Sequence, residues 1–364
     1  MTAAKHSTSD ETIRVLYIGM KYDYGDPKRG LCHEYINFLG TLQRMENIDV
    51  DFFFYDEVLV QQGMVAMNEQ LIAAVKDISP DICFFVLFTD EITKETIRWI
   101  SEKSGAKTVN WFTDDHWRFE LHSKIFAPEF HWVVTTDHAS VEKYHQIGCA
   151  NVILSQWGFN HFAGLPQTTE YLYDVSFIGQ VHSTRREFVG RLKQNKIAVD
   201  SWGRGWQNGR IGSEEMKTKF VQSKINLNFT SSSNALTLKR LTKIFLHRRS
   251  DSTFHVNSPL HMFREIQTMF HHRRSQIKGR NFEIPGYGGF LLSEFVEGID
   301  QYYIPDKEIV LFKNFDELIN KIRFYLQNDT QRETIRIAGQ KRTLREHTYE
   351  KRFQKIFEIM LSKL

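Results

Sequence analysis

Short apolar runs of strand length alternate with segments of helical period along this 364-residue chain, and this alternation constrains its fold more than any other feature. It predicts parallel β-sheets covered by helices, because parallel strands need crossover connections. In the first half of the chain we predict strands at Ile13–Ile18, Val50–Tyr55, Asp81–Phe88, Lys107–Phe112, His131–Thr136 and Asn151–Trp157. The segments of helical period between them are Leu31–Met45, Asn68–Ile78, Thr93–Ser104 and Ser140–Ile147.

The same pattern restarts after a linker at Gly158–Glu170. Because a single core rarely serves a chain of this length, we expect two successive α/β domains of similar size, with ligands at the carboxyl ends of their strands. The tail, Thr330–Leu364, is predicted to be helical throughout. The second domain has predicted strands at Tyr173–Ile178, Ile197–Trp202, Ile225–Phe229, Phe290–Phe295 and Glu308–Phe312, and predicted helices at Ser183–Asn195, Ser213–Ser223 and Phe315–Leu326.

Composition is that of a globular protein, with 41% apolar and 25% charged residues. The net charge of +3 is too small to indicate nucleic acid by itself. Three cysteines without metal or redox spacing favour a reducing compartment. Met1–Glu11 lacks the apolar core of a secretory signal, and no apolar run approaches the roughly 18 residues of a membrane span. We therefore expect a cytoplasmic protein, with peripheral attachment to the inner face of the membrane left open.

A basic segment, residues 231–276, interrupts the strand–helix rhythm of the second domain and is predicted to be an insertion. From Lys239 to Arg280 there are ten Lys or Arg residues against two acidic ones. Three interpretations stay open for it. It lies on an anionic membrane surface, it holds an acidic acceptor such as a phosphorylated glycan, a lipid-linked phosphate or DNA, or it is a solvated surface feature.

The turn FIGQVHSTRRE joins the first strand of the second domain to a helix. The strand ends at Gly179, and the helix that follows carries Arg185 and Arg186 in its first turn. A helix N-terminus beside two arginines can hold a diphosphate. The alternative is an ordinary strand–helix turn with solvated arginines.

A second turn, SWGRGW, follows the next strand. Its two glycines, Gly203 and Gly205, let the backbone approach a ligand closely, and Trp202 or Trp206 offers a flat wall for a base. A glycine turn with a tryptophan packed in the core explains the same residues.

The segment IKGRNFEIPGYGGFLLSE, at Ile277–Glu294, is the most specific in the chain. Glu283 falls in a short helical turn, where its carboxylate can accept two hydrogen bonds from a ribose diol. Lys278 and Arg280 lie just upstream and can neutralise phosphates. Gly288 and Gly289 permit a tight turn into the apolar strand that follows.

This segment resembles the donor site in the C-terminal half of GT-B-fold glycosyltransferases, in the branch related to the spore-maturation protein CgeB. Most of the chain outside the basic segment shares the resemblance. It extends to DVSFIG at the start of the second domain, EIVLFKNFDELINKIRFYL, REHTYEKRF, NWFTDDHWRFE and VVTTDHASVEKYHQIG.

The resemblance implies two Rossmann-like domains that face each other across a cleft. Residues 1–160 would form the acceptor domain, residues 161–345 the nucleotide-sugar domain, and residues 346–364 a helix that returns to the first domain. Glu283 would bind the ribose, while Lys278, Arg280 and Arg185 would meet the diphosphate. The expected donor is a UDP-, GDP- or dTDP-sugar, used as a co-substrate without a permanently bound cofactor.

The resemblance also implies the activity, transfer of a sugar to a hydroxyl group in polysaccharide biosynthesis or a related process. The acceptor is a glycan, a lipid-linked saccharide, a protein or a modified nucleobase, so nucleic acid enters only as an acceptor. Two other functions stay open. One is a sugar-nucleotide epimerase of the same architecture, and the other is a nucleic-acid-binding protein that uses the basic segment.

The catalytic base is sought at the carboxyl end of a strand in the first domain. Ser275 stands where many retaining relatives carry an additional Glu, so the residues leave the stereochemical course open. An inverting reaction needs a base, and Asp114 and Asp115 are the best-placed candidates, with helix capping as the alternative. The two carboxylates are adjacent, which is not the usual spacing of a cation site, and we expect no metal. Weaker candidates are Asp23, His33 and His116.

Overall fold

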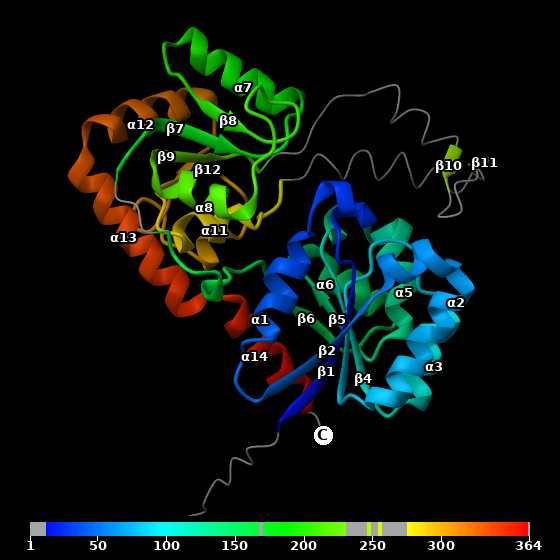
Figure 1. The fold of residues 1–364 in the computed structure, drawn as a ribbon. Coiled ribbons are helices and arrows are strands. Elements are labelled where there is room, and N and C mark those ends of the chain that lie inside the picture. Colours follow the sequence, from blue (N-terminus) through cyan, green and yellow to red (C-terminus); the bar gives the residue numbers. More distant parts are fainter. Residues whose placement is uncertain (1–11, 167–169, 231–245, 249–253, 257–274, 363–364) are drawn as a thin grey trace, which may run out of the picture. The chain divides into compact units, whose positions relative to one another are not determined.

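The computed structural model describes residues 12–166, 170–230, 246–248, 254–256 and 275–362. The chain divides into two compact units, each with a parallel sheet of its own (Figure 1). Two Rossmann-like α/β domains are therefore confirmed. The first unit comprises the residues up to Thr113, His122–Leu154 and Ile356–Leu364, and the second comprises Asp114–Leu121 and Ser155–Lys355.

The first unit is built on a six-stranded parallel sheet with the order β2-β1-β3-β4-β5-β6. Its central strands are buried on both faces, which is why they appear in the sequence as continuous apolar runs without a polar side. All six predicted strands are present. They are β1 (Ile13–Gly19), β2 (Ile48–Phe54), β3 (Ile82–Phe85), β4 (Lys107–Phe112), β5 (Trp132–Thr135) and β6 (Val152–Leu154).

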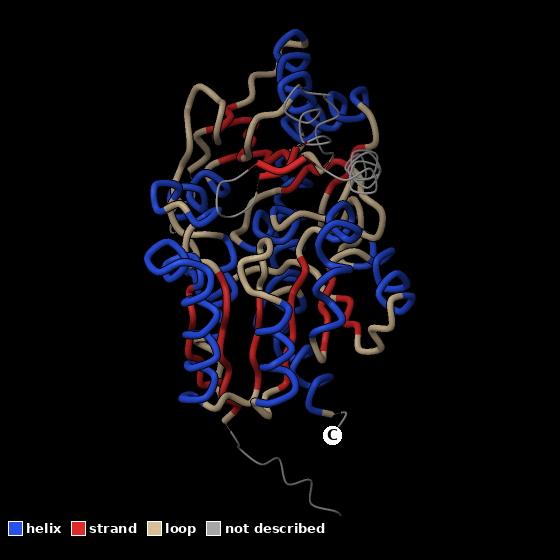
Figure 2. The backbone as a smooth tube through the Cα atoms, turned by 90° about the vertical axis from the view of Figure 1, so that its right-hand side faces the viewer, coloured by secondary structure: helices blue, strands red, loops and turns tan. Residues whose placement is uncertain are grey.

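Helices flank the strands of this sheet (Figure 2), and aromatic side chains pack against both of its faces. The ring of Phe84 contacts Phe38 and Phe357, each with 6.4 Å between centroids. The next residue, Phe85, points to the opposite face and contacts Phe130 at 5.1 Å. The helices of this unit include α1 (Gly40–Leu42), α2 (Tyr55–Ile78), α3 (Lys94–Lys103), α5 (Lys124–Phe126), α6 (His138–Gln146) and the last turns of α14 (Tyr349–Leu361).

Two predicted helices differ from the structure. The segment Leu31–Met45 contains a π-helical stretch, Tyr35–Leu39, before α1. Helix α2 begins 13 residues before the predicted Asn68, directly after β2. Its first half has no clear apolar stripe, because Val60 and Val65 are exposed and Gly63 breaks the helix with a φ of 83°.

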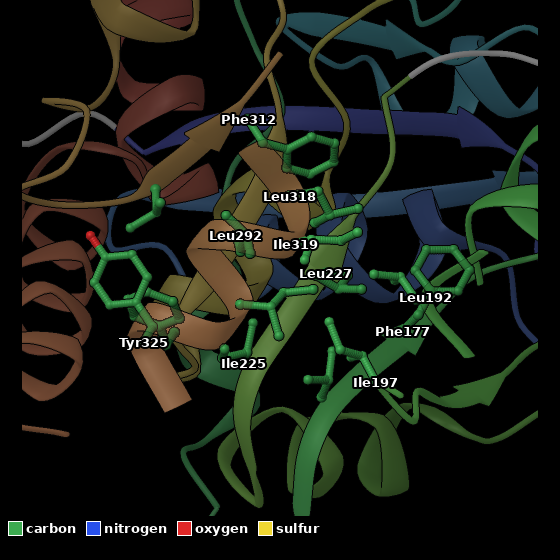
Figure 3. Packing of buried hydrophobic residues seen from close by; sticks show 14 of the residues in the cluster. Phe177, Leu192, Ile197, Ile225, Leu227, Leu292, Phe312, Leu318, Ile319 and Tyr325 are labelled. Atoms are coloured by element: carbon green, nitrogen blue, oxygen red, sulfur yellow. The ribbon is translucent and has the colours of Figure 1, made fainter. Parts of the chain in front are cut away.

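The second unit is built on a five-stranded parallel sheet with the order β13-β12-β9-β7-β8. Figure 3 shows its main core, in which Phe177 and Leu227 of the sheet pack near Leu318 of a covering helix. All five predicted strands are present. The elements are β7 (Tyr173–Ile178), β8 (Asp200–Trp202), β9 (Ser223–Asn228), β12 (Leu291–Glu294) and β13 (Val310–Phe312), with α4 (Asp115–Arg118), α7 (Ser183–Gln194), α8 (Ser213–Val221), α11 (Arg280–Gly286), α12 (Phe315–Gln327) and α13 (Asp329–Glu346).

The tail is not helical throughout, and that prediction is wrong. Helix α13 ends at Glu346 and α14 begins at Tyr349. The break is stabilised by a backbone pair with Phe159, which donates to the His347 carbonyl (2.9 Å) and accepts from the Tyr349 N–H (3.0 Å). Helix α14 starts in the second unit, and its residues from Ile356 belong to the first.

Most of the basic segment 231–276 lies outside the described residues. Its described parts include two short antiparallel strands, β10 (Leu246–Arg248) and β11 (Phe254–Val256), which interrupt the parallel pattern as an insertion does. The three interpretations of the segment stay predictions. Across the described ranges, none of the helices combines the length and apolar character needed to cross a membrane.

A buried histidine lies at the break between α13 and α14. His347 Nε2 donates to the Tyr302 carbonyl at 2.6 Å, so its Nδ1 is free to accept from Arg352 Nη2 at 3.2 Å. Burial, reinforced by the Arg352 charge, lowers the His347 pKa to about 4, although Glu346 opposes the shift. The folded protein therefore holds this imidazole neutral.

A neutral buried histidine makes stability depend on pH. The unfolded chain takes up the His347 proton below about pH 6.5, whereas the folded chain resists it down to about pH 4, so stability falls as the pH drops through this window. We expect this residue alone to cost about 2 kcal/mol between pH 8 and pH 5. Urea unfolding of the wild type and of His347→Gln at both pH values measures the difference, which should shrink in the variant. An equal pH dependence in the two proteins would contradict the assignment.

Candidate functional site

Helix α11 carries most of the predicted site, and buried amides fix it to the sheet of the second unit. Asn281 Oδ1 accepts from the Lys278 N–H at 2.9 Å and from Asn228 Nδ2 at 3.2 Å. Both amides also donate to the Ser293 hydroxyl, each at 3.1 Å. These three side chains are almost inaccessible to solvent. Since buried polar groups are costly unless hydrogen-bonded, this network holds α11 in one position at the carboxyl ends of β9 and β12.

Three cationic side chains gather beside α11. Burial, together with the charge of the nearby Arg280, lowers the pKa of Arg185 to about 10. Burial also lowers the pKa of Lys278 to about 8, where the charge of Arg185 adds to the effect and Asp114 opposes it. Arg280 acts on Arg185, and Arg185 acts on Lys278, so the three charges lie close together. The arrangement is therefore suited to a multiply charged anion.

Arg185 projects from the first turn of α7 and is held by backbone carbonyls. Its Nη1 donates to Gln180 at 2.9 Å and its Nη2 to Phe229 at 3.1 Å. Its buried Nε has no hydrogen-bond partner in the part of the chain that the structure describes. The two carbonyls thus fix the position of the guanidinium. The neighbouring Arg186 is exposed on α7.

The carboxylates of the site have separate partners. Glu283 is buried on α11 and pairs with Arg280, one turn earlier on the same helix. Glu294, at the end of β12, accepts from the Thr230 N–H (2.9 Å) and influences the Arg185 pKa. Glu294 was not singled out from the sequence. Its position at the end of a predicted strand could have indicated that it lies near the site.

Asp114 belongs to the second unit by its contacts, although it directly follows β4 of the first. It occupies the N-cap position of α4, yet its side chain makes no capping hydrogen bond. Instead, Gln276 Nε2 donates to its Oδ1 at 3.3 Å, and its charge acts on Lys278. Asp115 and His116 are buried in the first turn of α4. Asp114 is thus placed beside the cationic cluster by contacts other than capping.

Two of the three weaker base candidates, Asp23 and His33, lie in the first unit and have local partners. Asp23 accepts from Arg29 Nε at 2.9 Å. His33 lies beside Asn37, whose Nδ2 is 3.1 Å from its Nδ1.

The SWGRGW turn packs against the end of β7. Gly203 has a φ of 131°, and a Cβ there would lie 2.3 Å from the Gly179 carbonyl oxygen. Trp206 donates from its indole nitrogen to that same oxygen at 2.9 Å, and its ring contacts Phe177. These contacts are those of a glycine turn with a packed tryptophan, the structural alternative given above.

Gly288 and Gly289 end α11. The Gly289 N–H donates to the Ile284 carbonyl (2.8 Å) and the Gly288 N–H to the Pro285 carbonyl (2.9 Å), the two hydrogen bonds of a Schellman motif. Gly288 has the left-handed φ of 89° that this motif requires. Both glycines therefore serve the turn that connects α11 to β12, and their close neighbours are protein atoms.

This capping role predicts a stability effect for Gly288→Ala. An Ala at a left-handed φ should lower the free energy of unfolding by about 1–2 kcal/mol, measured by urea denaturation. Gly190→Ala is the matched control, because Gly190 lies in α7 with open space around it, so that variant should be neutral or more stable. Equal effects of the two substitutions would refute the capping role.

Comparisons with known proteins agree with this geometry. Residues 184–358 match the model of a family described as glycosyl transferase-like. A search of curated proteins finds no match. Three solved structures are similar over 97% of this chain and 100% of their own. They are Anabaena Alr3699/HepE in complex with UDP-glucose (12% identity, TM-score 0.61), sucrose-phosphate synthase from Thermosynechococcus elongatus (9%, 0.59) and the lipopolysaccharide outer core galactosyltransferase WaaB (11%, 0.53).

At such identities the structural likeness establishes the fold alone. Residues 184–358 are similar to a glycosyl transferase-like family, in a chain whose two Rossmann-like units have the GT-B fold of these structures.

Proposed function

We propose that the protein transfers a sugar from a nucleoside-diphosphate sugar to an acceptor hydroxyl, and that the cluster around α11 holds the donor. The main support is that Arg185, Lys278 and Arg280 lie close together. Their positive charge is offset only in part by the carboxylates of Glu283 and Asp114. A diphosphate carries the opposite charge and accepts hydrogen bonds from all three side chains. The family match of residues 184–358 supports the same activity.

Glu283 is proposed to bind the ribose. Its carboxylate is buried next to Arg280, so the helix offers a cation for phosphate and an acceptor for the ribose hydroxyls within one turn. UDP is the first nucleotide to test, because one similar structure, that of Alr3699/HepE, contains UDP-glucose.

The proposed catalysis depends on the negative charge that develops on the leaving diphosphate. As the acceptor oxygen bonds to the anomeric carbon, the bond from that carbon to the diphosphate breaks and negative charge grows on the leaving group. Lys278, Arg280 and Arg185 stabilise that charge in a partly buried setting, where fixed donors are most effective. For an inverting course, Asp114 is the carboxylate proposed to take the acceptor proton.

Finer features belong to the same proposal. The three cations supply the positive charge that a divalent ion would otherwise bring, so the reaction is proposed to proceed without metal. The segments quoted above favour the CgeB-like branch, a hexosyl donor and a role in polysaccharide synthesis. The epimerase alternative lacks an identified acid/base pair around a sugar. The nucleic-acid and membrane alternatives depend on residues 231–276, which lie mostly outside the described residues.

Loss of the ribose acceptor should weaken nucleotide binding. Calorimetric titration with UDP, GDP and dTDP is expected to show at least tenfold weaker binding for Glu283→Ala, or about 1.4 kcal/mol. Arg280→Ala should lower turnover of the UDP-sugar by about 10²–10³, the usual cost of removing one preorganised donor. Arg345→Ala is the control, since Arg345 is exposed on α13. Wild-type behaviour of both site variants would refute this site.

The depressed pKa of Lys278 adds a pH test. A bound diphosphate favours the protonated amine, so affinity should be complete below pH 8 and should fall by up to tenfold per unit as the pH rises above it. UDP titrations from pH 7 to pH 9.5 measure this slope. Lys278→Met should bind more weakly at pH 7 and lose the slope. The same slope in the variant would assign the titration to another group.

A further inference from the structure

The segment HTYEKR, at His347–Arg352, takes no direct part in the proposed donor site, yet several of its residues are buried near α11, the helix of that site. His347 and Thr348 form the break between α13 and α14, where both are almost inaccessible to solvent. Phe159 pairs with this break through two backbone hydrogen bonds of 2.9 and 3.0 Å. The approach is so close that a Cβ on Gly158 would lie 2.9 Å from the Tyr349 nitrogen.

The C-terminal end of α11 rests on this pair. The fully buried ring of Phe159 lies against Gly286, where a Cβ would come within 2.4 Å of the ring. The same ring meets Tyr287 edge to face at 4.7 Å. The C-terminal end of the donor-site helix is therefore in contact with the partner strand of the break.

The N-terminal part of α11 rests on the side chains of the motif. Phe282, which directly precedes Glu283, meets the His347 ring at 5.6 Å and the Arg352 guanidinium at 5.7 Å. Arg352 also lies over the Tyr302 ring at 5.4 Å. The imidazole connects the two contacts, because it donates to the Tyr302 carbonyl and accepts from Arg352.

Arg352 is a largely buried arginine with few polar partners. Its Nε is buried without a hydrogen-bond partner in the described portion of the chain. Burying such a charge costs free energy of folding. Contacts with two aromatic rings and one imidazole nitrogen offset only part of that desolvation penalty. An apolar side chain would fill the space at lower cost, so stability alone does not account for an arginine here.

We propose that His347 and Arg352 are positioning residues for the donor site. They fix Phe282, and with it the register and orientation of α11, so that Lys278, Arg280 and Glu283 meet the nucleotide diphosphate in the binding geometry. The inference rests on the proposed function, since it assigns these residues to the same site. They act through α11 and do not touch the nucleotide.

Arg352→Met and His347→Leu test the proposal in the full chain, because both keep the volume and remove the polar contacts. Hydrogen exchange followed by mass spectrometry should show faster exchange in the peptides that cover residues 277–290, while β7 and β9 keep their protection. UDP titrations well below the unfolding midpoint should show at least tenfold weaker binding. A residue that contributes stability alone would lower the midpoint without changing either result.

Arg345→Met is the matched control, because Arg345 belongs to the same motif region but has 64% of its side chain exposed. It should behave as the wild type. Unchanged exchange in residues 277–290, or wild-type UDP affinity in a folded Arg352→Met or His347→Leu, would overturn the positioning role. Failure of the proposed function has a different signature, in which the wild-type protein itself binds none of UDP, GDP and dTDP.

Discussion

Arg185, Lys278 and Arg280 bring like charges together in a partly buried part of the second unit. Burial is the main cause of the depressed pKa values of Arg185 and Lys278, and repulsion between the cations adds to it. Neighbouring carboxylates reduce the repulsion without removing it. A bound anion would remove it, so an arrangement that costs stability in the free protein is suited to the diphosphate proposed to bind there.

Such a cluster persists only because its scaffold is rigid. Asn228, Asn281 and Ser293 form a buried polar network that joins α11 to β9 and β12. Any of these groups would be costly without its partners, so the network admits few alternative positions of α11. Two backbone carbonyls restrain Arg185 in the same way. Like charges that repel one another and hydrogen bonds that fix their positions thus occur together, as expected of a preorganised site.

The sequence predicted the sheets better than the site. Strands such as β3 are wholly apolar because both of their faces are buried, so their position follows from composition alone. The first half of α2 gave no such signal, because Val60 and Val65 face solvent. Gly288 illustrates the harder problem, since a glycine that caps a helix and a glycine that admits a ligand look alike in sequence.

Arg352 shows why the remainder could not be predicted. Near the end of a polar helix, an arginine is expected to lie in solvent, and only the fold reveals that it lies on Phe282. That contact depends on the break at His347, which depends in turn on backbone pairing with Phe159, nearly two hundred residues away. The segments that meet there are also those through which the chain passes between its units, at Ser155 and after Lys355. The contacts proposed to orient α11 therefore lie close in sequence to the points where the chain passes between its units.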